Sequence, residues 1–165
     1  VIVTATGFEV GKFLFPAAYQ GLGGRDLHQH WEAGDGPRTY RGMMVPAFPN
    51  LFMLYGPNTN VGSGSIIFML ECQQRYVTQM IEAQRAGGWA YADIRAEVQT
   101  SFVQEVATRS ASSTFTGNCQ SWYKTADGRN TNNWIGSGFE FRDRTAQPDL
   151  ANYTLVQAQS AQKAA

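Results

Sequence analysis

The residues best suited to bind a ligand form a loop of small and polar residues at the start of the longest helix that the sequence predicts. The loop covers residues 56–65, with the sequence GPNTNVGSGS, and the helix opens with the apolar run IIFML. The first N–H groups of a helix have no acceptor inside the helix, and they attract anions and carbonyl oxygens. The loop therefore predicts a binding site for an anionic or carbonyl group.

The elements on either side of this loop would hold it in place. A strand is expected over residues 51–55, and a helix from Ser65 to about residue 86. Ser63 or Ser65 can cap the start of the helix, and the glycine pair at 87–88 can end it. The first helical turns are apolar on every side, which is typical of a helix that is buried on every side. We therefore expect its N-terminus to lie in the protein interior.

The composition indicates a globular chain without a charged binding surface. The chain has 165 residues, 43% of them hydrophobic, and 13 basic residues balance 13 acidic ones. One domain is expected at this length. The lack of a basic block argues against nucleic acid or an anionic membrane as a partner. No apolar run reaches the roughly 18 residues of a membrane-spanning helix.

The metal-ligating residue types are few and poorly spaced. Cys72 and Cys119 are the only cysteines, and they form neither a CxxC pair nor another ligand spacing. This favours a reducing, cytoplasmic location and argues against a disulfide framework. His28 and His30 are the only histidines and fall in a predicted loop, whereas catalytic zinc usually takes three protein ligands. No metal site is predicted.

The segments before the central loop predict strands and irregular structure. Residues 1–8 form a β-branched run typical of a buried strand. The chain begins inside this run and without Met, so we interpret it as a fragment of a longer protein. Residues 9–49 are interrupted by Gly and Pro, which predicts loops and short strands that pack over a sheet.

The segments after the central helix mix strand, helix and turn signals. Residues 91–98 predict an edge strand or a turn of helix, and a capping-box spacing at Ser101 predicts a helix that fades near Ser110. Aromatic residues are frequent between 114 and 144, with a hairpin turn expected at the Asp-Gly pair 127–128.

Five motifs occur in a distinctive order. They are ATGF at 5–8, GGRDL at 23–27, FPNLF at 48–52, LYGP at 54–57 and Glu71 in the helix. Their order and spacing closely resemble the C-terminal part of flavin-dependent Baeyer–Villiger monooxygenases, most of all the cyclohexanone and 4-hydroxyacetophenone monooxygenase group. The resemblance covers residues 1–155, and the tail at 156–165 is expected to be disordered.

The resemblance implies an α/β fold, here an α+β fragment. It would be the C-terminal portion of a Rossmann-like FAD-binding flavoprotein with two dinucleotide domains. Neither GxGxxG fingerprint of that family is present in the chain. The fragment would therefore lack the N-terminal units that bind the FAD pyrophosphate and most of NADP.

The resemblance also implies roles for the central loop. The FAD contacts that it implies are Gly56, Pro57, Asn58, Gly64, Ser65 and Ile66. Val61, Gly62 and Ser63 would lie beside the substrate pocket. The N–H groups at the helix start would stabilise the negative charge that gathers near N1 and the C2 carbonyl of a reduced flavin.

A second implied site is a closing loop at about 114–144. Trp122 in this loop would contact NADP, and Trp134 is an alternative residue for the same contact. Trp122 could instead pack over the sheet. The catalytic Arg of the family is expected outside this chain.

The function implied is that of an FAD- and NADPH-dependent monooxygenase. With O2 it would convert a ketone to an ester or lactone through a C4a-peroxyflavin. The fragment alone would be inactive, since it needs the N-terminal remainder of the enzyme, and oligomers are possible. Two alternatives stay open: an N- or S-oxygenating flavin monooxygenase, and a stand-alone module that binds a sugar or aromatic ligand on Trp122, Tyr123 and Trp134.

Overall fold

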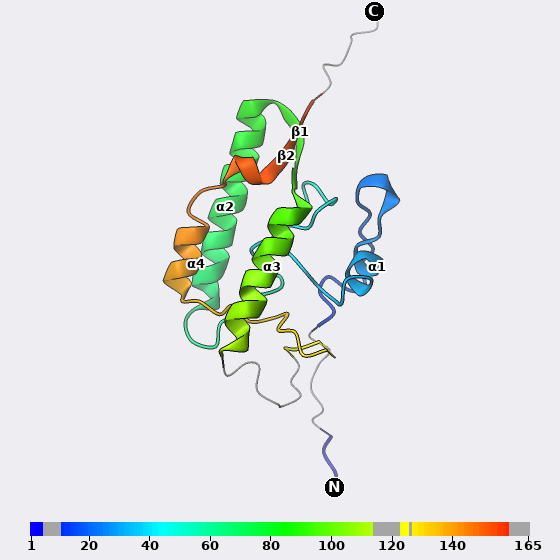
Figure 1. Ribbon diagram of the computed structural model, residues 1–165, viewed down its shortest axis with the longest axis vertical. Coiled ribbons are helices and arrows are strands. Elements are labelled where there is room, and N and C mark those ends of the chain that lie inside the picture. Colours follow the sequence, from blue (N-terminus) through cyan, green and yellow to red (C-terminus); the bar gives the residue numbers. More distant parts are fainter. Residues whose placement is uncertain (5–10, 114–122, 126, 159–165) are drawn as a thin grey trace, which may run out of the picture.

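The computed structural model describes residues 1–4, 11–113, 123–125 and 127–158. In this part of the chain the α-helices and strands are α1 (Leu27–Glu32), α2 (Ile66–Gly87), β1 (Trp89–Ile94), α3 (Ala96–Ala111), α4 (Gly138–Arg144) and β2 (Tyr153–Gln157), and short 3-10 helices lie at Leu22–Gly24 and Leu150–Asn152. Figure 1 shows α4 alongside the first half of α2, and the β1–β2 ribbon at the other end of α2. None of the described helices is both long and apolar enough to cross a membrane.

The central helix α2 forms where the sequence predicts it. The Ser65 hydroxyl accepts a hydrogen bond from the Phe68 N–H at 3.2 Å, which caps the helix start. At the other end Gly88 adopts a left-handed conformation with φ of 67°, and its N–H donates to the Gln84 carbonyl. Only glycine takes up this conformation without steric cost, so the glycine pair ends the helix as expected.

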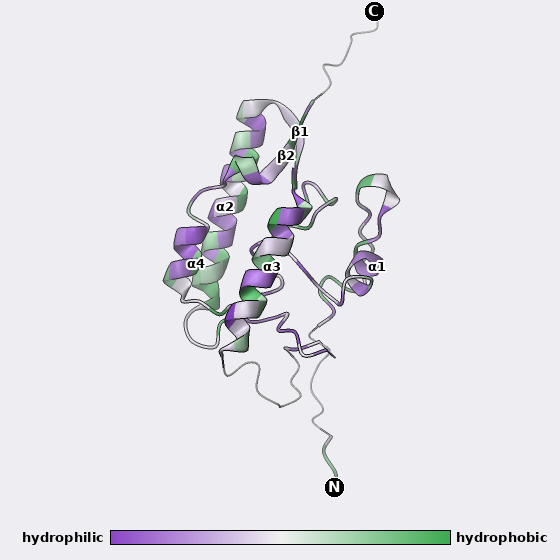
Figure 2. Ribbon diagram, in the orientation of Figure 1, coloured by the Kyte–Doolittle hydropathy of each residue, from purple (hydrophilic) through white to green (hydrophobic). Residues whose placement is uncertain are grey.

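The burial of α2 differs from the prediction. Met69, Cys72, Tyr76 and Met80 form one buried stripe, whereas Ile67 remains 64% exposed. The expectation that the helix start is buried on every side is therefore wrong for the structure of this chain. Figure 2 shows that hydrophobic residues are concentrated in the N-terminal part of α2. An apolar side of this part faces solvent.

The sheet consists of two antiparallel strands in the described residues. β1 pairs with β2 from Trp89 opposite Gln157 to Ile94 opposite Tyr153. The strand alternative for the start of 91–98 is thus correct, but α3 begins soon after it at Ala96. The predicted cap at Ser101 is wrong, because that residue lies inside α3, while the predicted end near Ser110 agrees with the observed end.

Three further predictions need correction. Residues 51–55 are not a strand; the Leu51 N–H donates to the Phe48 carbonyl at 3.3 Å, as in a turn, and the Met53 N–H donates to the Met43 carbonyl at 2.9 Å. The described part of the predicted strand 1–8 is exposed and unpaired with any described strand. A strand needs a neighbour for its backbone groups, and β1 and β2 already pair with each other. The disordered tail predicted for 156–165 is wrong at its first two residues, because β2 extends to Gln157, and residues 159–165 lie outside the described residues.

Two hydrophobic clusters hold the described fold together. The larger joins α2, β1, α3 and α4 around Tyr76, Phe102 and Trp134. The smaller joins α1 to the loop that follows it, with Leu27 and Trp31 as central members. In Figure 1 this second group lies to one side of α3, and α2 and α4 lie to the other.

Candidate functional site

The first half of the central loop is buried, and its residues 56–58 form a supporting base for the exposed second half. A Cβ atom at Gly56 would overlap the Gly42 carbonyl, so two backbone segments can approach closely only because residue 56 is glycine. The Thr59 hydroxyl donates to the Gly56 carbonyl at 2.7 Å, and the Thr39 hydroxyl donates to the Pro57 carbonyl at 3.3 Å. These bonds fix the loop before it reaches the surface.

Asn58 connects this base to a distant segment. Its side chain is 3% exposed, and its amide donates to the Asn130 carbonyl at 2.9 Å and to the Asn133 carbonyl at 3.4 Å. Its backbone N–H donates to the Thr131 carbonyl at 3.1 Å. The residue has a φ of 62°, a left-handed conformation that asparagine adopts more readily than most residues.

Asn60 continues the pairing in parallel orientation. Its N–H donates to the Asn132 carbonyl at 3.0 Å, and its own carbonyl accepts from the Trp134 N–H at 2.7 Å. Beyond this point the two segments separate, with residues 61–65 on one side and residues 134–139 on the other. The pairing therefore determines which residues face each other across the site.

A cavity of about 710 Å³ opens between the separated segments. Its lining residues are Val61, Gly62, Ser63, Gly64, Ser65, Phe68, Met69, Trp134, Ile135, Gly136, Ser137, Gly138 and Phe139. The three residues predicted for a substrate pocket are among them, as are two predicted for the flavin. The volume is in the range of small-molecule sites.

The predicted flavin residues fall into two groups in the structure. Gly64 and Ser65 line the cavity, and Ile66 follows them as the first residue of α2. The other three, at positions 56–58, are buried in the base of the loop. Their assignment to the flavin remains a prediction. In the structure, their contacts hold the loop in place.

The start of α2 offers backbone groups to a ligand. Gly64 has a φ of 121°, and the space where its Cβ would lie is open. The Ser65 hydroxyl accepts from the Phe68 N–H. The N–H groups that precede Phe68 in the first turn of α2 have no acceptor inside the helix. A flat ring or an oxygen atom can approach this backbone without a side chain in the way.

The opposite wall was not predicted as part of the pocket, and the alternative NADP contact at Trp134 remains a prediction. Trp134 lies within it with 3% of its surface exposed, and its indole N–H donates to the Ser137 carbonyl at 3.1 Å. The Ser137 hydroxyl in turn accepts from the Glu140 N–H at 3.1 Å and caps α4. The spacing of Ser137 and Glu140 is that of a capping box, a signal in the sequence that could have located α4.

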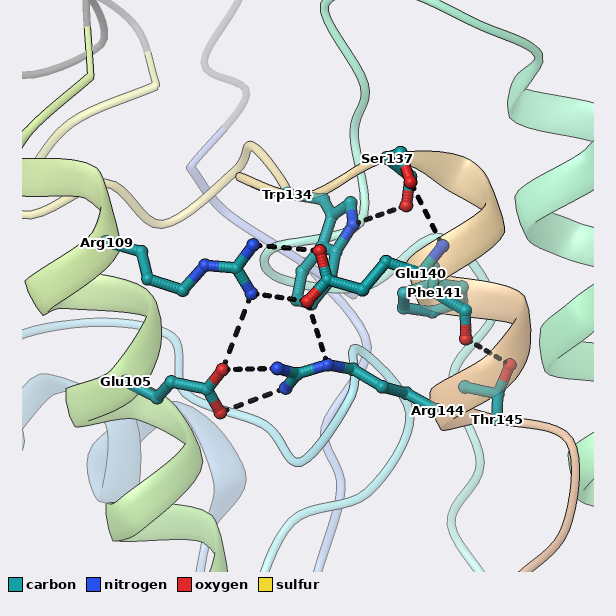
Figure 3. Close-up of polar contacts among 8 residues, drawn as sticks. All are labelled: Glu105, Arg109, Trp134, Ser137, Glu140, Phe141, Arg144 and Thr145. Carbon is teal, nitrogen blue, oxygen red and sulfur yellow. Dashed lines mark hydrogen bonds and ion pairs between the residues drawn. The ribbon is translucent and has the colours of Figure 1, made fainter.

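Behind this wall lies a cluster of four charged residues, shown in Figure 3. Arg109 donates two bonds to the Glu140 carboxylate at 2.6 and 2.8 Å, and Arg144 donates two to Glu105 at 2.6 and 2.9 Å. The hydrogen bonds from Arg109 lower the pKa of Glu140, and those from Arg144 lower the pKa of Glu105. Both carboxylates are thereby stabilised in their charged form.

The predicted closing loop is described only in part. Trp122, the predicted NADP contact, lies outside the described residues. The Asp-Gly turn at 127–128 is present: Thr125 and Arg129 are joined by a backbone bond of 2.9 Å, and Gly128 has a φ of 88°. Arg129 also donates to the carbonyls of Asp35 and Pro37. The turn is thus attached to the loop after α1.

The described residues contain no group of three or more histidine, cysteine or acidic side chains that could hold a metal. His28 and His30 lie on α1 rather than in the predicted loop. The His28 imidazole instead contacts the Ala17 carbonyl at 3.0 Å. Cys72 is free and buried in α2.

The site belongs to a chain with clear relatives, although no family profile matches it. The chain is 41% identical over 166 residues to an FAD-binding monooxygenase of Aspergillus niger, ktnD, covering 98% of this chain and 27% of that protein. It is 35% identical to a Baeyer–Villiger monooxygenase of Streptomyces coelicolor, covering 98% of this chain and 31% of the relative.

Solved structures share the fold. An oxidised steroid monooxygenase bound to NADP matches with a TM-score of 0.69 and 27% identity, over 84% of this chain and 26% of that one. A cyclohexanone monooxygenase from Rhodococcus sp. Phi1 matches in fold with a TM-score of 0.68 at 21% identity, again over 84% of this chain and 26% of that one.

The fold and the relatives show that the chain is homologous to part of the FAD-binding monooxygenases. More narrowly, it is a segment homologous to the FAD-binding Baeyer–Villiger monooxygenases, as the order of its motifs predicted. It spans about 27–31% of the length of these curated relatives.

The role of Asn58 can be tested by changing it to glycine. Asn50 is a matched control because it has nearly the same φ, 61° against 62°, but an exposed side chain. We expect Asn58→Gly to lower the free energy of unfolding by about 2 kcal/mol, since the buried Asn130 carbonyl loses the Asn58 amide as its donor, while the Asn133 carbonyl keeps the bond from the Asn130 amide at 2.9 Å. Asn50→Gly should change it by less than about 0.5 kcal/mol. Equal effects in urea titrations would contradict this role.

The charged cluster predicts a pH-dependent stability. Glu140→Gln should cost about 1 kcal/mol at pH 7, the upper range for partly exposed ion pairs. The pKa of Glu140 lies below its usual value of 4.5 in the folded protein, so its contribution is complete above that value and is lost as the pH falls through the folded-state pKa. The difference in Tm between wild type and variant should therefore shrink from pH 7 to pH 3. A constant difference would contradict the prediction.

Proposed function

We propose that this chain is the C-terminal part of an FAD- and NADPH-dependent monooxygenase that converts a ketone to an ester or lactone. The observation that carries the proposal is the cavity at the start of α2, in a chain homologous to Baeyer–Villiger monooxygenases over nearly its whole length. The complete activity would require the remainder of the enzyme, because the chain covers less than a third of these relatives.

The residues at the start of α2 fit the reactive end of a flavin. FAD, when bound, supplies the reduction of O2 and the transfer of oxygen, with NADPH as the hydride source. Gly64 leaves open space for a flat ring, while the N–H groups at Ser65 and Ile66 would stabilise negative charge on it. The buried base at 56–58 would keep these groups at a fixed position.

The rest of the cavity fits a small apolar ketone. Val61, Gly62 and Ser63 would contact it from one side, and Trp134 and Phe139 lie on the other. The mainly apolar lining would exclude water from the reacting carbonyl. For NADP, the contact from Trp122 remains a proposal, with the attached turn at Arg129 as its support.

The alternative of a stand-alone aromatic module receives less support. A platform for a sugar or aromatic ligand needs an exposed ring, and Trp134 is almost completely buried. An N- or S-oxygenating monooxygenase would share the cavity and the cofactors, so it is separated only by the substrate.

The experiment that tests the proposal uses the complete protein with FAD, NADPH and O2. Purified enzyme would be offered cyclic and aryl ketones, and in parallel a tertiary amine and a sulfide. We expect NADPH to be consumed as the ketone is converted to an ester or lactone that is heavier by one oxygen atom. Oxygenation of the amine or sulfide alone would support the alternative enzyme, and no oxygenation of any of them would reject the monooxygenase proposal.

The assignment of the cavity predicts the effect of narrowing it. Ser63→Phe places a ring in the cavity, whereas Ser101→Phe places one on the exposed side of α3. The first change should lower kcat/KM for the preferred ketone roughly tenfold or more and leave the bound flavin unchanged. The second should leave kcat/KM within about twofold of wild type. Equal loss in both variants would place the substrate elsewhere.

A further inference from the structure

Trp134 is held by contacts that differ in direction. Its ring stacks parallel to Phe102 at 6.4 Å, with 7° between the planes, and meets Phe141 edge to face at 5.5 Å. The guanidinium carbons of Arg109 and Arg144 lie over the ring, 5.4 and 5.6 Å from its centre. The wall of the cavity is therefore in direct contact with both cations of the charged cluster.

The cluster is a closed ring of alternating charges. In addition to the two bidentate pairs, Arg109 reaches Glu105 at 3.4 Å and Arg144 reaches Glu140 at 3.0 Å. Each carboxylate thus contacts both guanidiniums. Two members come from α3 and two from α4, so the ring ties these helices together across Trp134, as Figure 3 shows.

The Glu140 carboxylate also reaches the backbone of the cavity wall. A Cβ atom at Gly136 would overlap this carboxylate and would lie 2.8 Å from atoms of the Trp134 indole. The carboxylate, the indole and the main chain at 136 are therefore packed against one another. A displacement of Glu140 would be felt directly by two residues that line the cavity.

We propose that the ring of Glu105, Arg109, Glu140 and Arg144 positions Trp134 and so determines how wide a ketone the cavity accepts. This inference rests on the proposed function because it takes a ketone as the substrate. The contacts between the ring and Trp134 do not depend on that function. Without the Glu140 charge, two cations would remain over one indole with a single carboxylate between them. Their repulsion would loosen the wall and admit bulkier substrates.

The test compares Glu140→Gln with Asp143→Asn in the complete, flavin-loaded protein. Asp143 is the matched control because it is also an acidic residue of α4 with an arginine partner, Arg142 at 2.8 Å, but lies outside the ring. For Glu140→Gln, we expect the ratio of kcat/KM for a bulky ketone to that for a small one to rise on the order of fivefold. The kcat for the small ketone should change less than twofold, and Asp143→Asn should keep the wild-type ratio.

A double variant tests whether the ring acts as a unit. Arg109→Gln should shift the same ratio, and the double variant Arg109→Gln/Glu140→Gln should shift it no further than the larger single effect. Additive shifts, or a uniform loss of activity on all ketones at an unchanged ratio, would overturn the positioning role in favour of a purely structural one.

A second readout keeps the inference independent of activity. Acrylamide quenching of tryptophan fluorescence would be compared with and without Trp134→Phe, because the chain contains 4 tryptophans. Glu140→Gln should increase the quenching that is due to Trp134, and Asp143→Asn should not. If the wild-type protein oxidises no ketone, the proposed function fails while this measurement still decides the geometry; unchanged quenching would overturn the inference.

Discussion

The structure of the site depends on the pairing of residues 58–60 with residues 130–134. This short parallel pairing joins segments that lie some seventy residues apart, through main-chain bonds at Asn60 and the buried amide of Asn58. A buried amide must be hydrogen-bonded, so the loop has one stable position. Everything that lines the cavity follows from where the two segments then diverge.

The two halves of the central loop differ in burial and in role. Its first half is buried and rigid because Gly56 and Pro57 pack against the main chain around Gly42. Its second half is exposed and carries small residues up to the cap at Ser65. A rigid base is what allows an exposed tip to present backbone groups at a defined place, which a flexible loop could not do.

The sequence predicted those parts of the fold that depend on local signals. α2 was found with both its ends because Ser65 and Gly88 are strong caps, and the loop before it was identified as a site. The predicted strands are absent at 51–55 and at 1–4, the described part of 1–8, because β-branched and aromatic residues indicate a strand only where a neighbour is available. The pairing at Asn58 and the wall at Trp134 depend on contacts between distant residues, which a single sequence does not reveal.

The two walls of the cavity have different electrostatic character, and this bears on what it can hold. The start of α2 is a fixed positive pole, because its first N–H groups point outward. The Trp134 wall is backed by four charges that cancel, since each carboxylate of the ring contacts both guanidiniums. An uncharged ligand with one electron-rich end would therefore be oriented with that end toward α2 and its apolar body toward Trp134. A ketone beside a reduced flavin has this polarity, whereas a cation would gain nothing from the neutral wall and would be repelled by the pole.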